Sequence, residues 1–97
     1  MNATEITDRL RAHECELREM GVKSLFLFGS VARGEAHPND VDLAAEFDRS
    51  KKIGLLALTD IQDALVEIVG GPVDLSEKTA LKGAVRQSAE QDFLLVY

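Results

Sequence analysis

The sequence predicts an α/β (α+β) fold built on a mixed β-sheet of about four strands, with helices mainly on one face. Apolar runs of strand length alternate with segments of helical periodicity, in the order helix, strand, strand, helix, strand, helix, strand. Glycines and a proline stand between several of these segments. The chain has 97 residues, 45% of them hydrophobic, which is enough for one core, so we expect residues 1–97 to form a single domain.

The first element is expected to be one amphipathic helix over residues 4–20. Thr4 suits the N-cap position, and Gly21 suits the residue that ends the helix. One face carries residues at helical spacing, namely Ile6, Leu10, His13, Leu17 and Met20. That face is expected to point inward.

Two strands follow, joined by a polar connection. Residues 23–28 are dense in apolar side chains, as in a strand buried on both faces. Residues 30–34 are predicted to form a short helical turn, and residues 35–39 a loop. The second predicted strand covers residues 41–47.

The second half of the chain supplies the remaining elements. The longest predicted helix covers residues 55–69 and ends at Gly70. Its inward face consists of Leu58, Ile61, Leu65 and Ile68. We expect a third strand at residues 73–76, a third helix at 79–91 and a last strand at 93–96.

Charge and composition limit the function. The formal net charge is −6 and the sequence pI is about 4.8, which argues against direct binding of nucleic acid, because such binding needs a basic surface. An acidic protein can still bind a nucleotide when metal ions and a few cations offset the phosphates. No apolar run approaches the roughly 18 residues that span a membrane, and the single cysteine, Cys15, excludes an internal disulfide. We therefore expect a cytoplasmic protein without membrane contact.

The most informative feature is a pair of aspartates that follows a Gly-Ser turn. Asp40 directly precedes the second predicted strand and Asp42 lies within it, so on extended backbone the two share one face. Two carboxylates about 7 Å apart repel each other unless a cation lies between them, and Mg²⁺ commonly arrives with substrate phosphates. Upstream, Gly29 and Ser30 end a strand and begin a helical turn, whose N–H groups and hydroxyl can meet phosphates. Arg33 carries donors that can reach the same phosphates. The pattern indicates metal-dependent nucleotidyl transfer.

These residues, which read FGSVARGEA at 28–36 and DVD at 40–42, resemble the minimal nucleotidyltransferases of the polymerase-beta superfamily. More narrowly, they resemble the minimal nucleotidyltransferase (MNT) antitoxin of HEPN–MNT toxin–antitoxin pairs. The resemblance covers nearly the whole chain, including GGPVDL at 70–75. The connection over residues 31–39 is one residue shorter than is usual in the family, which a loop absorbs. The resemblance implies a minimal nucleotidyltransferase palm without the extra helical domain of larger relatives.

The resemblance also implies roles for individual residues. It makes Asp74 the third acid of the site. Three catalytic carboxylates would hold two Mg²⁺ ions, and they are Asp40, Asp42 and Asp74. The nucleotide-binding residues would be Gly29, Ser30 and Arg33, with ATP as the substrate.

The implied reaction is the transfer of AMP from ATP to a tyrosine hydroxyl of a HEPN-family ribonuclease toxin. Two alternatives stay open from the sequence. The chain could neutralise the toxin by binding alone, or it could modify a small molecule in the manner of aminoglycoside nucleotidyltransferases. A hetero-oligomer with the toxin or a homo-oligomer would supply the acceptor site that so short a chain lacks room for.

Overall fold

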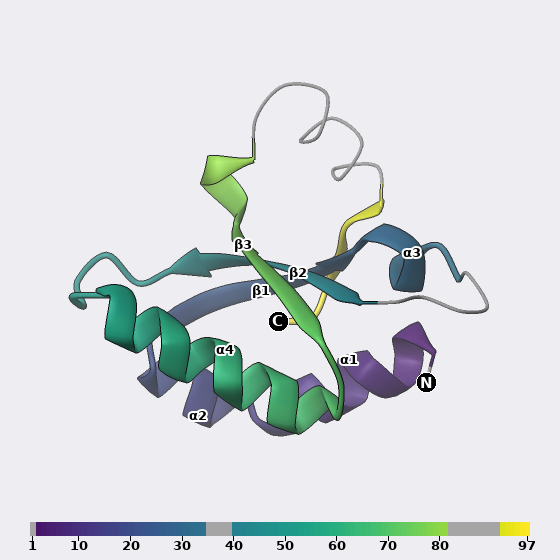
Figure 1. The fold of residues 1–97 in the computed structure, drawn as a ribbon, viewed down its shortest axis with the longest axis horizontal. Helices are drawn as coiled ribbons and strands as arrows, with labels where there is room; N and C mark the ends of the chain where they lie inside the picture. Colours follow the sequence, from purple (N-terminus) through teal and green to yellow (C-terminus); the bar gives the residue numbers. More distant parts are fainter. Residues whose placement is uncertain (1, 35–39, 82–91) are drawn as a thin grey trace.

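The computed structural model describes residues 2–34, 40–81 and 92–97 (Figure 1). In chain order, its elements are α1 (Ala3–Ala12), α2 (Glu14–Glu19), β1 (Val22–Phe28), α3 (Gly29–Ala32), β2 (Val41–Phe47), α4 (Leu55–Val69), β3 (Val73–Glu77), the short 3-10 helix η1 (Lys78–Ala80) and β4 (Leu94–Leu95).

The four strands form one mixed sheet in the order β3-β2-β1-β4. β1 runs antiparallel to β2 and to β4, whereas β2 and β3 run parallel. Helices α1, α2 and α4 lie together on one side of the sheet, and η1 lies on the other (Figure 1). This arrangement confirms the predicted mixed sheet with helices mainly on one face. The face without these helices is called the open face below.

The core lies between the sheet and the three helices. Its largest fully buried side chains are Ile6, Leu10, Leu17, Val22, Leu25, Leu27, Leu43, Ile61, Leu65, Val69 and Val96. Among the described residues, no polar or charged side chain is buried. Within the same ranges, no helix has both the length and the apolar character needed to cross a bilayer.

The N-terminal segment forms two helices instead of the single one predicted. α1 ends at Ala12, and its C-cap residue His13 has a φ of −108° and a ψ of 16°, outside the helical region. α2 begins at the next residue, Glu14. The change of direction lets α1 pack against α4 while α2 packs against β1. The N-cap is Asn2 and not Thr4, because the Asn2 side chain accepts a hydrogen bond from the backbone N–H of Glu5 at 2.9 Å. The His13 side chain is 40% exposed and contacts Glu16, so it does not face the core as predicted.

The side chains of β1 are fully buried on one face only, so the prediction of a strand buried on both faces is wrong; the helices that the structure describes on that face are α1, α2 and α4. Leu25 and Leu27 are fully buried, whereas Phe26 and Phe28 on the open face are half-buried. These two rings pack against Phe93, with ring centroids 5.5 and 5.6 Å away. Within the described residues, aromatic contact with Phe93 accounts for the apolar side chains of Phe26 and Phe28 on the open face.

The other elements agree with their predicted positions where they are described. α4 has the predicted bounds, and β3 ends one residue later than expected. β4 is shorter than the predicted strand. The predicted third helix over 79–91 is wrong where it is described, because Thr79 and Ala80 belong to the 3-10 helix η1 and Leu81 has an extended backbone. Residues 82–91 and the predicted loop 35–39 lie outside the described residues.

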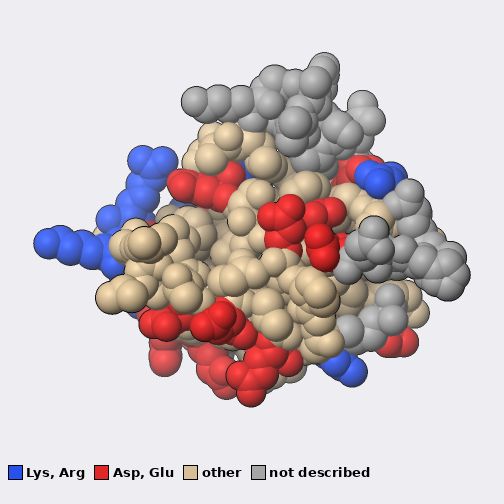
Figure 2. Space-filling view, in the orientation of Figure 1, with Lys and Arg blue, Asp and Glu red and all other residues tan. Residues whose placement is uncertain are grey.

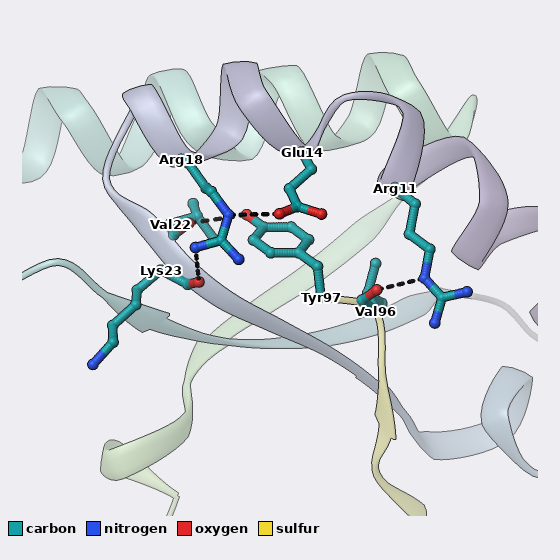
Figure 3. A network of polar contacts seen from close by, with 7 residues as sticks. All are labelled: Arg11, Glu14, Arg18, Val22, Lys23, Val96 and Tyr97. Carbon is teal, nitrogen blue, oxygen red and sulfur yellow. Dashed lines mark hydrogen bonds and ion pairs between the residues drawn. The ribbon is translucent and has the colours of Figure 1, made fainter.

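Side chains from the helices hold the C-terminal residues in place (Figure 3). Arg11 of α1 donates from Nε to the carbonyl oxygen of Val96 at 2.6 Å. The Tyr97 hydroxyl donates to the carbonyl oxygen of Val22 at 3.0 Å. Arg18 of α2 lies over the Tyr97 ring, 4.8 Å from its centroid. The two residues that follow β4 thus contact α1, α2 and β1, and these contacts keep the short strand in place.

Candidate active site

The predicted acidic residues gather near one end of the sheet, on the open face. Asp42 is the second residue of β2 and Asp74 the second residue of β3, and the parallel register pairs the two directly. Their neighbours Val41 and Val73 face the core, so the alternation of side chains turns both carboxylates to the open face. Figure 2 shows a group of acidic side chains near the centre of the view, close to where β2 and β3 cross in Figure 1.

The electrostatics of Asp42 reveal its neighbours. Burial raises the pKa of the Asp42 carboxyl above its ordinary value, the charges of Asp74 and Asp40 raise it further, and the charge of Arg33 lowers it. Such effects weaken with distance, so the three aspartates and the arginine share one region of the surface. Asp40 itself is exposed and lies directly before β2.

A glycine lies in direct contact with the central acid. Gly29 follows β1 with a φ of +76°, in the left-handed region that favours glycine. A Cβ at this position would collide with Oδ2 of Asp42 and lie 3.0 Å from its Cγ. The sequence therefore needs glycine here for two reasons, the backbone conformation and the space that Asp42 occupies.

The short helix α3 brings two further predicted residues to the same end of the sheet. Ser30 lies in its first turn and is partly exposed, two residues after Phe28, which pairs with Asp42 in the sheet. Val31 is only 3% exposed and anchors α3 on the core. Arg33 is the C-cap residue of α3, and its side chain forms an ion pair with Asp92 at 2.8 Å.

The donor set suits Mg²⁺, because carboxylate oxygens are the ligands that this ion prefers. Within the described ranges, no three Asp, Glu, His or Cys side chains stand close enough together to hold a metal ion. The fit therefore rests on the register that pairs Asp42 with Asp74, on the burial and the neighbouring acids that raise the pKa of Asp42, and on the space left by Gly29. The fold brings these acids to the same region of the surface, but among the described residues their carboxylates do not converge on a single metal position.

The sequence reasoning missed Asp92. This residue lies in the described segment 92–97 and contacts Arg33 across 59 positions of the chain. An isolated aspartate before a short apolar run carries no local signal, so only the three-dimensional arrangement reveals the pair.

Comparison with known proteins decides the family. The nucleotidyltransferase domain model matches residues 10–96. The chain belongs to the nucleotidyltransferase domain family. This nucleotidyltransferase is 35% identical over 94 residues to protein adenylyltransferase MntA of Thermococcus cleftensis. The match covers 95% of this chain and 93% of the relative. It is 35% identical over 96 residues to a provisionally named protein adenylyltransferase of Methanocaldococcus jannaschii, which covers 96% of each chain.

Solved structures share its fold. A provisionally assigned minimal nucleotidyltransferase matches with a TM-score of 0.68 at 27% identity, over 97% of this chain and 95% of the other. A toxin–antitoxin complex with AMP-PNP matches with a TM-score of 0.67 at 20% identity, over 90% and 72% of the two chains. The complex of tri-AMPylated Shewanella oneidensis HEPN toxin with MNT antitoxin matches with a TM-score of 0.63 at 16% identity, over 94% and 71%. The enzyme class and the minimal nucleotidyltransferase fold predicted from the motif are confirmed.

Proposed function

We propose that this nucleotidyltransferase transfers AMP from ATP to a tyrosine hydroxyl of a HEPN-family toxin and thereby neutralises it. The observation that carries the proposal is the pairing of Asp42 with Asp74 beside the Gly29 turn. Further support comes from the likeness to an adenylyltransferase over nearly the full length of both chains. The neighbours in fold include a complex between an MNT antitoxin and an AMPylated HEPN toxin.

We assign the metal-binding role to Asp40, Asp42 and Asp74. Two Mg²⁺ ions held there would offset the charge of the triphosphate and lower the pKa of the attacking hydroxyl. In the absence of metal, burial raises the pKa of Asp42 most, and the negative charges of Asp74 and Asp40 raise it further. Binding of a divalent cation would relieve the repulsion between these charges, so the acidic group favours a metal-bound state.

The chain's own residues bind and orient the nucleotide. Gly29 leaves room for close approach of a phosphate, and the Ser30 hydroxyl and the Arg33 guanidinium donate hydrogen bonds to it. The acceptor oxygen then attacks the α-phosphorus, the bond between the α-phosphorus and the bridging oxygen breaks, and pyrophosphate leaves. Asp74 lies on the edge strand β3 and is exposed. We assign it the position nearest the incoming hydroxyl, where it takes the proton.

The acceptor is proposed to come from a partner protein. A chain of 97 residues has little room for a second substrate pocket beside the nucleotide. The net charge of −6 suits a protein partner better than a nucleic acid. The expected setting is the cytoplasm, where the exposed thiol of Cys15 stays reduced.

Transfer of label tests the proposal directly. The nucleotidyltransferase and its toxin are incubated with Mg²⁺ and ATP labelled on either the α- or the γ-phosphate. We expect the toxin to acquire the α-label only, and Asp42→Asn to reduce the rate by about two orders of magnitude or more. Asp63→Asn, an exposed change on α4, is the matched control and should leave the rate unchanged.

Substitution of the proposed metal-binding acids also separates catalysis from binding. If Asp42→Asn and Asp74→Asn still neutralise the toxin fully and no label is transferred by the parent protein, neutralisation proceeds by binding alone and the proposal is wrong.

A further inference from the structure

A groove lies between helix α4 and the edge strand β3. Its volume is about 330 Å³, and its lining residues are Phe47, Leu58, Thr59, Gln62, Leu75 and Glu77. Within the described part of the chain, this lining includes three apolar residues and no lysine or arginine. β3 is the outermost strand of the described sheet on the side of α4, so a partner protein can approach the groove past this edge (Figure 1).

An exposed leucine extends the groove along α4. Leu55 is the first residue of the helix and is 81% exposed. The hydroxyl of Thr59, one turn further on, donates to the carbonyl oxygen of Leu55 at 3.0 Å, so the two residues lie in one row of the helix. The neighbouring Leu56 is 83% exposed but lies about 100° further round the helix, away from that row. Leu55 and the groove therefore form one apolar surface.

This surface is connected to the candidate active site through β3. Leu75, which lines the groove, directly follows Asp74, whose carboxylate lies on the open face. Gln62, on the opposite wall, donates from Nε2 to the carbonyl oxygen of Val73, the residue directly before Asp74. A protein that binds over the edge of β3 would thus contact the groove and bring its own residues next to Asp74.

The charge around the groove indicates the kind of partner. Glu77 lines the groove and is exposed, and Asp74 lies on the same strand. The ammonium of the next residue, Lys78, lies over the rings of Phe26 and Phe93, 4.3 and 5.5 Å from their centroids, on the open face. Like charge disfavours a second copy of this chain, with its net charge of −6, and it disfavours a nucleic acid as well. The complement of this surface is an apolar side chain flanked by lysines or arginines.

We propose that the groove between α4 and β3, extended by Leu55, is the docking surface for the toxin that the proposed function requires. A ribonuclease must bind RNA, so it carries the basic surface that this acidic edge complements. The bound toxin reaches over β3 and presents its acceptor hydroxyl at Asp74. The inference rests on the proposed function, because it names where the protein substrate of that reaction binds.

Initial rates of AMP transfer at varied toxin concentration and saturating ATP test this surface. Leu55→Gln removes the apolar side chain but keeps a good helix former, and we expect it to raise the KM for the toxin about tenfold. The kcat and the KM for ATP should stay within about twofold of the parent values, because no residue of the candidate active site changes. Leu56→Gln, an equally exposed change one position along α4, is the matched control and should leave the KM for the toxin unchanged.

Reversal of one charge is a second test that leaves the apolar side chains in place. Glu77→Lys puts a cation at the groove and should raise the KM for the toxin about tenfold at low salt, with a smaller effect at high salt. Glu67→Lys makes the same charge change on the α1 side of α4, beside Arg9 and His13, and should change this KM by no more than about twofold. Thermal unfolding identifies a variant that does not fold, and the other substitution at the groove then decides.

The outcomes distinguish the docking surface from the function on which it rests. The surface is wrong if Leu55→Gln leaves the KM for the toxin unchanged, or raises it no more than Leu56→Gln does. It is also wrong if the parent protein forms a dimer in sedimentation equilibrium that Leu55→Gln dissociates, because a second copy then fills the groove. If the parent protein transfers no AMP to the toxin, the proposed function is wrong, and the Kd of the complex with the toxin then shows the same effects of the variants or overturns the docking surface too.

Discussion

At the scale of single residues, the site depends on the contact between Gly29 and Asp42. Gly29→Ala would place a methyl group against the Asp42 carboxylate and force an L-residue into a φ of +76°. We expect the free energy of unfolding to fall by about 2 kcal/mol or more, because alanine is strained at positive φ and the collision adds to that strain. Urea denaturation measures the change.

A second glycine serves as the matched control. Gly34 has nearly the same φ, +78°, but a Cβ there would meet no atom of the described residues within 4 Å. Gly34→Ala therefore carries the backbone strain without the collision, and we expect it to cost about 1 kcal/mol. Equal losses in the two variants would show that the contact with Asp42 is unimportant.

Asp42 also makes stability depend on pH. Its pKa is raised above the ordinary value of 3.8, chiefly by burial, so the ionised form is less favourable in the folded than in the unfolded chain. This destabilisation is complete above the folded pKa and disappears as the pH falls toward 3.8. Without metal, Asp42→Asn should raise the free energy of unfolding at pH 7 by less than about 1 kcal/mol, which a slightly higher melting temperature would reveal. The difference should vanish near pH 4. A melting temperature at pH 7 that is lower in the variant would contradict this account.

Local patterns predicted where several residues of the candidate site lie, because their positions follow short-range rules. The period of two along β2 places Asp42 opposite the core, and the turn at Gly29 follows from a glycine after an apolar strand. The role of Asp74 came from family resemblance, since its pairing with Asp42 depends on a parallel register between distant segments. Asp92 could not be predicted, because its contact with Arg33 is purely tertiary.

At the scale of elements, the short strand β4 needs side chains to keep it in place. The Tyr97 hydroxyl donates to the carbonyl oxygen of Val22 at 3.0 Å in a partly buried position. Tyr97→Phe keeps the ring against Arg18 and removes only this hydrogen bond, so it should lower the free energy of unfolding by about 1 kcal/mol. Thermal unfolding should show a loss of about 5 °C.

The control for this prediction is another hydroxyl that bonds to a backbone carbonyl. Thr59 donates to the carbonyl oxygen of Leu55 on the exposed surface of α4. Thr59→Val should change stability by no more than about 0.5 kcal/mol, because water replaces the lost partner there. If both substitutions have the same small effect, the Tyr97 contact does not hold β4.

The elements themselves were predictable to different degrees. α4 has strong helical periodicity and its predicted bounds are correct. The same periodicity continued through His13 and concealed the break between α1 and α2, which arises because these helices pack against different partners. The apolar residues of β1 suggested burial on both faces, yet Phe26 and Phe28 are half-buried and pack against Phe93, a contact that is not a local property of the sequence.

At the scale of the whole molecule, the acidic chain places its proposed metal site on an open sheet face and has little room for a second substrate. The β2–β3 edge of the sheet, which carries Asp42 and Asp74, is therefore the surface on which a partner would have to present its acceptor hydroxyl.

The most direct measurement is the intact mass of the partner toxin after co-expression with this nucleotidyltransferase. The account predicts a gain of one or more AMP units on a tyrosine when the parent protein is present, and the unmodified mass when the Asp42→Asn, Asp74→Asn double variant replaces it. An unmodified toxin that is nevertheless neutralised by the parent protein would contradict the account.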